Sequence, residues 1–329
     1  MNGAVSRRAL AARPRLELVD TVIWLILAAL VFANLRLNSS FLELSNVYFT
    51  FGSALALVLA AMAAGLVMLI AEIDLTIGSV MTLTNVCIAR WASEDLGLAL
   101  LLGSAVGVCC GLVVGGLVSF LRLPSIIVTL AMSTVWGGVA LYVMPKPGGT
   151  APVELGEMII GPIPLIACVV LGIAWSWLGR SRAGRRIYGL GSDELAAYLS
   201  GIPLHRTKLF VFGLAGLLLG WAGIALTAVT GGGDPLVGSP YTLQAITAAV
   251  LGGISFAGGR GTLWGAIAGA LVLVLITSVV QLSGVSAFYQ GIVNGGLLVA
   301  SVALSRFTTG RWLPLPRIAL AARGGSDGG

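Results

Sequence analysis

Residues 47–71 read VYFTFGSALALVLAAMAAGLVMLIA, a run of 25 residues without one charged side chain. The hydrocarbon core of a bilayer needs about 20 apolar residues of α-helix to cross it. In this run apolar residues fall on every face, whereas a strand of a transmembrane β-barrel would alternate apolar and polar residues. The stretch therefore predicts a membrane-spanning helix.

The composition of the whole chain agrees with this reading. Of its 329 residues 57% are hydrophobic and only 10% are charged, and its mean hydropathy is +1.01. A soluble domain has about 25% charged residues. Composition therefore excludes a soluble enzyme and a disordered chain. The net charge of +6 is better explained by the positive charges of membrane-protein loops than by nucleic-acid binding.

Charges and turn residues divide the chain into about ten apolar stretches, which predict an all-α, polytopic membrane protein. The last run, Gly261–Ser305, is too long for one helix and is divided at Gln281–Ser286 into two spans. The other eight are Thr21–Leu37, Val47–Ala71, Leu75–Trp91, Leu96–Leu121, Leu123–Pro145, Met158–Gly179, Leu209–Gly232 and Pro235–Gly259.

The positions of the basic residues predict the orientation. With ten spans and a cytoplasmic N-terminus, only Arg36, Arg90 and Lys146 of the 19 basic residues fall on the outer side. This bias is typical of cytoplasmic loops. We therefore expect a cytoplasmic arm at residues 1–20, a transmembrane domain at 21–306, and a cytoplasmic, partly disordered tail at 307–329.

One cytoplasmic loop, residues 180–208, is long enough to carry structure of its own. Ser192 suits an N-cap, Asp193 and Glu194 suit the first helical turn, and Gly201 suits the position just after a helix. The predicted helix carries one apolar stripe at i, i+3, i+4 spacing, made of Leu195, Tyr198 and Leu199. The spacing leaves two interpretations open: the stripe packs on the membrane or the chain's own bundle, or it docks into a groove on a cytoplasmic partner.

Four blocks of sequence resemble one family. The first block is in the loop and comprises residues 184–188 and 191–202. The other three are IDLTIGS at 73–79, LPSIIVTL at 123–130 and LGGISFAGGRGTLWG at 251–265. Together they resemble bacterial ABC importer permeases of the ribose/xylose/galactose class. Two positions depart from the family pattern, because Glu72 stands where glycine is usual and Gly137 where arginine is common. These departures leave the identity of the sugar open.

The resemblance implies partners and a location in the bacterial inner membrane. A permease of this class pairs with a second permease copy as a homo- or heterodimer, binds cytoplasmic ATPase subunits, and receives a monosaccharide or related polyol from a periplasmic binding protein. It also implies that the loop is an ATPase-coupling element whose contact residues are Ser192, Asp193, Glu194, Leu195, Tyr198, Leu199 and Gly201.

Polar and glycine-rich breaks predict the translocation path. Asp74 precedes a short, polar third span, where it either caps the next helix, the favoured interpretation, or forms a gate in a broken helix. Gly258–Gly261 breaks the second half at a comparable place, which suggests an inverted repeat around the path. The candidate gate and path residues are Asp74, Gly78, Asn85, Thr129, Ser133, Gly258 and Gly259.

Chemistry within this chain is not expected. The segment Gly258–Thr262 has glycines but no following Gly-Lys-Ser/Thr, so it is not a phosphate-binding loop. One histidine and four cysteines without C-x-x-C spacing predict neither a catalytic group nor a metal or cofactor site. The alternatives are a facilitator or secondary transporter working alone and a branched-chain amino-acid ABC permease.

Overall fold

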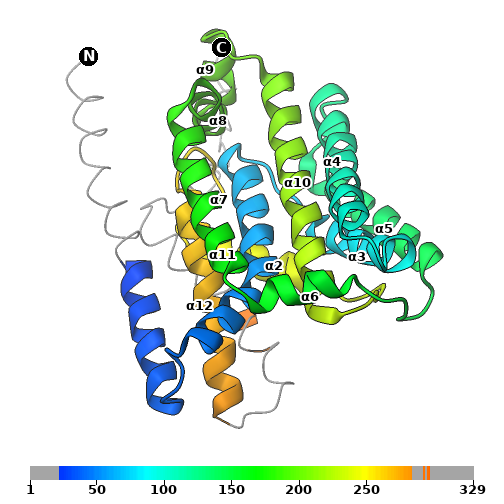
Figure 1. Cartoon of the computed structure of the whole chain (residues 1–329). Helices are drawn as coiled ribbons and strands as arrows, with labels where there is room; N and C mark the ends of the chain where they lie inside the picture. Colours follow the sequence, from blue (N-terminus) through cyan, green and yellow to red (C-terminus); the bar gives the residue numbers. More distant parts are fainter. Residues whose placement is uncertain (1–21, 284–291, 293–294, 297–329) are drawn as a thin grey trace, which may run out of the picture.

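A computed structural model describes residues 22–283, 292 and 295–296, and every regular element in them is a helix (Figure 1). The predicted all-α class is therefore confirmed for the described part of the chain. The predicted arm 1–20 and the tail 307–329 lie outside the described residues, as does the last predicted span apart from 292 and 295–296.

The helices follow one another with short connections. An initial helix, Val22–Leu37, precedes the labelled elements. These are α2 (Leu44–Leu69), α3 (Ile77–Trp91), α4 (Leu96–Phe120), α5 (Ser125–Val143), α6 (Val153–Ile160), α7 (Ile163–Arg180), α8 (Arg182–Ser192), α9 (Glu194–Leu199), α10 (Leu204–Thr230), α11 (Tyr241–Leu251) and α12 (Leu263–Leu282).

Helix α2 lies at the centre of the molecule (Figure 1). Every residue from Ala56 to Leu69 is buried, and α2 contacts α7, α10, α11 and α12. Its many alanines allow neighbouring backbones to approach closely, as small residues do in membrane helix packing. The first run identified in the sequence therefore forms the core of the fold.

Glycines join α4 to α10. A Cβ added at Gly107 or Gly111 of α4 would overlap the backbone of α10, and one at Gly216 or Gly220 of α10 would overlap the backbone of α4. The four-residue spacing on α4 therefore serves the close helix contact that such spacing favours.

Six helices among the described residues are long and apolar enough to cross a membrane: α2, α4, α5, α7, α10 and α12. A multi-pass membrane protein is thus supported, whereas the number ten is not. Three predicted spans differ from the observed helices. The third is the 15-residue α3, the sixth is divided between α6 and α7 at Gly161-Pro162, and the eighth contains only the 11-residue α11.

The shortening of the eighth predicted span has a local cause. Pro240 is the residue before α11, and Gly252 follows it. Hydropathy alone does not register these breaks, because proline and glycine end helices without adding charge. Both α3 and α11 are largely buried, so neighbouring helices rather than lipid surround them.

Candidate functional site

The predicted loop 180–208 is mostly helical and lies at one end of the molecule, beyond the end of α7 (Figure 1). Ser181 caps α8, because its Oγ accepts hydrogen bonds from the amides of Ala183 and Gly184. Gly184 lies against the backbone of Gly179, which allows α7 to turn sharply into α8. The sequence prediction missed α8, although a serine before an arginine-rich amphipathic segment was its signal.

Asp193, and not the predicted Ser192, is the N-cap of α9. The Asp193 carboxylate accepts the Ala196 amide at 3.0 Å. Ser192 is the last residue of α8, and its hydroxyl donates to the Tyr188 carbonyl at 2.7 Å. The prediction was wrong by one residue because α8 continues to Ser192, so this hydroxyl serves the end of one helix instead of the start of the next.

The predicted end of α9 is confirmed. Gly201 has a φ of +78°, in the left-handed region that favours glycine. Its amide bonds to the carbonyl of Tyr198, and the amide of Ile202 bonds to the carbonyl of Ala197. These two bonds form a Schellman motif, which satisfies the last carbonyls of the helix.

The apolar stripe of α9 faces away from the described chain. Leu195, Tyr198 and Leu199 are 68%, 65% and 76% exposed, while Ala197 on the opposite face is buried. Three large apolar side chains on a short capped helix form an exposed patch of the kind that marks an interaction site. The interpretation that the stripe packs on the chain's own bundle therefore finds no support among the described residues.

The hairpin formed by α8 and α9 packs on two non-helical breaks in the membrane domain. One is the segment after α2, residues 70–76, and the other is the loop between α11 and α12. Gly259 donates its amide to the carbonyl of Leu69, the last residue of α2. A Cβ at Gly191 would overlap that same carbonyl, and a Cβ at Gly258 would overlap Gly191 and Ala71. The end of α2, the end of α8 and the loop between α11 and α12 therefore meet without intervening side chains.

Lys208, in the first turns of α10, joins the hairpin to the loop after α2. Its ammonium lies 2.7 Å from a carboxylate oxygen of Glu72 and 3.1 Å from one of Glu194, the first residue of α9. Lys208 and Glu72 are largely buried, whereas Glu194 is mostly exposed. The sequence prediction missed this link, because the three residues are far apart in the chain.

Asp74 stabilises a turn before α3 and does not cap the helix. Its carboxylate accepts both the amide of Thr76, at 2.7 Å, and the Thr76 hydroxyl, at 2.6 Å, and Thr76 itself precedes α3. Burial raises the pKa of Asp74 above its ordinary value, and these hydrogen bonds oppose that rise. Thr129 of α5 lies beside this turn, with its hydroxyl 3.3 Å from the Ile73 carbonyl.

Gly78 and Asn85 of α3 bond to α10, α11 and the segment between them. The Gly78 amide bonds to the Thr242 hydroxyl at 2.9 Å. The Asn85 amide nitrogen bonds to the Gly232 carbonyl at 2.9 Å, and its oxygen accepts the Asp234 amide at 2.8 Å. The amide nitrogen of the buried Asn85 also bonds to the Thr227 hydroxyl at 3.0 Å, so this side chain joins α3 both to α10 and to the segment that follows it.

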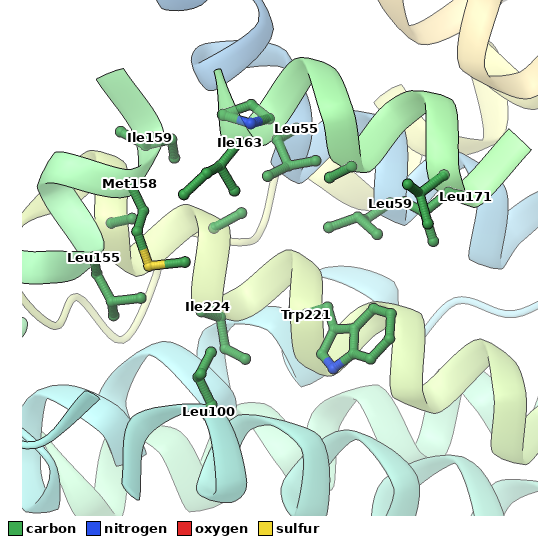
Figure 2. Close-up of a pocket in the computed structure, with 15 residues that line it drawn as sticks. Leu55, Leu59, Leu100, Leu155, Met158, Ile159, Ile163, Leu171, Trp221 and Ile224 are labelled. Atoms are coloured by element: carbon green, nitrogen blue, oxygen red, sulfur yellow. The ribbon is translucent and has the colours of Figure 1, made fainter. Parts of the chain in front are cut away.

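The seven candidate path residues lie at separate places in the described part of the chain. Asp74 lies near Thr129, Gly78 and Asn85 share a helix, and Gly258 and Gly259 lie under the hairpin, while the Ser133 hydroxyl bonds to the Leu130 carbonyl of its own helix. A cavity of about 290 Å³ in the described part is instead lined by apolar side chains (Figure 2). It lies among α2, α4, α6, α7 and α10, and its wall includes Leu59, Leu155 and Trp221.

This chain is similar to known transport permeases. A family model described as "Branched-chain amino acid transport system / permease component" matches residues 46–302. The ribose import permease protein RbsC of Escherichia coli (strain K12) is 33% identical over 300 residues, covering 87% of this chain and 92% of the relative. RbsC of Bacillus subtilis (strain 168) is 35% identical over 281 residues, 82% and 87% of the two chains.

A further relative is named for another sugar. The D-allose transport system permease protein AlsC of Escherichia coli (strain K12) is 33% identical over 276 residues, covering 81% of this chain and 85% of the relative. No solved structure matches this chain.

Proposed function

Since this chain belongs to the branched-chain amino acid transport system / permease component family, we propose that it is the membrane subunit of an ATP-driven importer for a monosaccharide or related polyol. The names of its relatives support a sugar, because they are ribose and D-allose permeases. The family description supports a second candidate substrate class, branched-chain amino acids.

ATP hydrolysis on a separate cytoplasmic subunit is part of this proposal. The observation that carries it is the exposed stripe of α9, formed by Leu195, Tyr198 and Leu199. The helix has both ends capped. The α8–α9 hairpin to which it belongs sits on the core through Gly191 of α8, which meets Leu69 and Gly259. A partner that moved α9 would therefore move the end of α2 with it. A periplasmic binding protein and a second permease copy would complete the importer.

The route from α9 to the path follows the observed contacts. Glu194 and Lys208 connect α9 to Glu72, and Glu72 lies two residues before Asp74. The turn at Asp74 contacts α5 through Thr129 and leads into α3, which carries Gly78 and Asn85. ATP-driven closure of the ATPases would switch these elements between two arrangements, as rigid-body transitions do.

The proposed orientation places both termini in the cytoplasm of a bacterium, with ten spans in the inner membrane. The distribution of basic residues supports it. It places α8 and α9 on the cytoplasmic side, where an ATPase would meet them.

Replacing Leu199 with Asp tests the coupling surface. The change would put an unpaired charge into an apolar interface, which costs several kcal/mol or expels the helix. We expect the variant to insert normally and to lose both co-purification of the ATPase and transport. The matched control is Ala196→Asp, because Ala196 is exposed on the same helix but lies outside the stripe. Normal co-purification and uptake with Leu199→Asp would show that α9 is only a surface connector.

Uptake of a labelled panel tests the substrate class. The panel contains ribose, allose, xylose, galactose and leucine, and the cells express the permease with its ATPase and binding protein. We expect uptake of a sugar and none of leucine. Uptake of leucine alone would replace the sugar proposal with the amino-acid alternative.

A further inference from the structure

Three arginines line a hollow between α8 and the end of α9. The hollow has a volume of about 340 Å³, and its wall is formed by Arg182, Arg185, Arg186, Ser200 and Ile202. A guanidinium presents several donors in a planar fork that matches phosphate oxygens, so three of them around a cavity form a site for a phosphate group.

These guanidiniums lack acidic partners among the described residues. Both ion pairs in this part of the chain involve Lys208, which occupies Glu194, and Asp193 is engaged as the cap of α9. Arg185 donates one hydrogen bond, to the carbonyl of Arg180. That carbonyl contributes no full negative charge, so the cluster keeps its positive charge.

The position of the arginines within α8 is unfavourable without an anion. Arg182 is the first residue of α8, and Arg185 and Arg186 follow one turn later. The N-terminal end of a helix carries partial positive charge, which repels cations. A bound anion would relieve both this repulsion and the repulsion among the three guanidiniums.

An apolar stripe on α7 ends close to the cluster in the chain. On α7 the exposed residues Ile166, Val170, Ile173 and Trp177 are spaced as one helical stripe. The stripe ends three residues before Arg180, and Trp177 is 77% exposed. Tryptophan is enriched at the level of lipid headgroups. Trp177 therefore marks the membrane interface just below the arginines.

We propose that this cluster binds the phosphate of an anionic phospholipid, such as phosphatidylglycerol, of the cytoplasmic leaflet. The acyl chains lie along the α7 stripe, and the headgroup phosphate fills the hollow lined by Arg182, Arg185 and Arg186. Because Ser200 of the same hollow immediately follows α9, the lipid steadies the coupling helix. The site rests on the membrane orientation proposed above, and it can be measured on the isolated permease without transport.

The test measures lipid binding to the purified full-length chain in detergent, where no charged bilayer surface contributes. Brominated phosphatidylglycerol is titrated in, and quenching of tryptophan fluorescence gives the dissociation constant. The test variant is Arg185→Gln with Arg186→Gln. The matched control, Arg206→Gln with Arg260→Gln, removes the same charge from exposed positions outside the hollow. Each lost contact charge should weaken binding about five-fold, giving about a 25-fold loss for the test variant, and little change for the control.

Four results would overturn the proposal. They are equal loss in the two double variants, equally tight binding of brominated phosphatidylcholine, displacement of the lipid by millimolar inorganic phosphate, and displacement by added ATPase subunit. The second would mean that no headgroup is recognised, and the third that the site is for a free phosphate. The fourth would mean that the arginines serve the ATPase. Failure of sugar transport in the wild-type protein would leave this measurement unaffected.

Discussion

The two breaks that meet beneath the α8–α9 hairpin are built differently. The break after α2, residues 70–76, begins with a backbone turn at Ala71 (φ +61°) and is then held by side chains: Glu72 pairs with Lys208, Asp74 bonds to Thr76, and Ser125 accepts the Ile73 amide. The break between α11 and α12 is held by backbone shape. Gly253, Gly258, Gly259 and Gly261 all have positive φ, and the Ser255 amide bonds to the Arg260 carbonyl.

This difference indicates where each break can change. Each side-chain bond of the first break can be weakened separately by one substitution. We therefore expect each substitution there to lower the stability by a small amount. Glycines with positive φ that touch another backbone leave no room for a side chain. We therefore expect a single substitution in the second break to cause a large loss of stability. In the proposed mechanism the second break is a rigid support for the α8–α9 hairpin, and the first break is the segment that changes conformation.

The largest expected effect follows substitution in the backbone-built break. In Gly259→Ala the new Cβ would occupy a left-handed position and overlap Ser192. In Gly201→Ala, also left-handed, it would meet nothing within 4 Å. We expect Gly201→Ala to cost about 1 kcal/mol of stability from backbone strain alone, and Gly259→Ala about 2–4 kcal/mol because overlap is added. Melting temperatures in detergent test the order; equal shifts would contradict the close seating of the hairpin.

A smaller effect is expected at the ion pairs of the first break. Lys208→Gln leaves the largely buried Glu72 without its partner, which should cost about 1–3 kcal/mol. Adding Glu72→Gln should recover part of this loss. The matched variant Glu194→Gln removes the exposed pair and should cost less than about 1 kcal/mol. A double-mutant cycle on melting temperature measures the coupling, and strictly additive effects would show that the Glu72–Lys208 contact contributes nothing.

The smallest expected effect distinguishes two changes at Asp74. Asn keeps an oxygen acceptor for the Thr76 amide and avoids burying a charge, so Asp74→Asn should change stability by less than about 1 kcal/mol. Asp74→Ala leaves that buried amide unsatisfied and should cost about 1–3 kcal/mol. Thermal unfolding compares the two. If Asn lowers the stability as much as Ala does, the negative charge of Asp74 itself stabilises the fold, and hydrogen bonding to Thr76 is not its only role.

Local signals in the sequence predicted the elements whose geometry depends on neighbours in the chain. Gly201 ends α9 as expected, since the Schellman bonds join residues only a few positions apart. The membrane-spanning helix α2 followed from one uninterrupted apolar run, whereas its central, buried position was not predicted. The N-cap of α9 was displaced from Ser192 to Asp193 because the preceding helix, α8, was not recognised.

Contacts between residues far apart in the chain could not be predicted, because local sequence signals do not report on them. Lys208 and Glu72 are separated by 136 positions, and no periodicity connects them. Glu72 was noticed only as a departure from the family pattern, and the structure gives it a partner. Hydropathy placed helices in the third and eighth predicted spans. It overestimated the length of the eighth, because Pro240 before α11 and Gly252 after it end the helix without changing the apolar average.

Reconstitution of transport tests the central claim, that this chain is a path driven by a separate ATPase. Proteoliposomes contain the permease alone, or the permease with its ATPase, and the binding protein and labelled sugar are supplied on the outer face. We predict uptake only when the ATPase and enclosed Mg-ATP are both present, and none when the ATPase carries a disabled nucleotide site. Full sugar uptake by the permease alone would contradict the account and identify a facilitator.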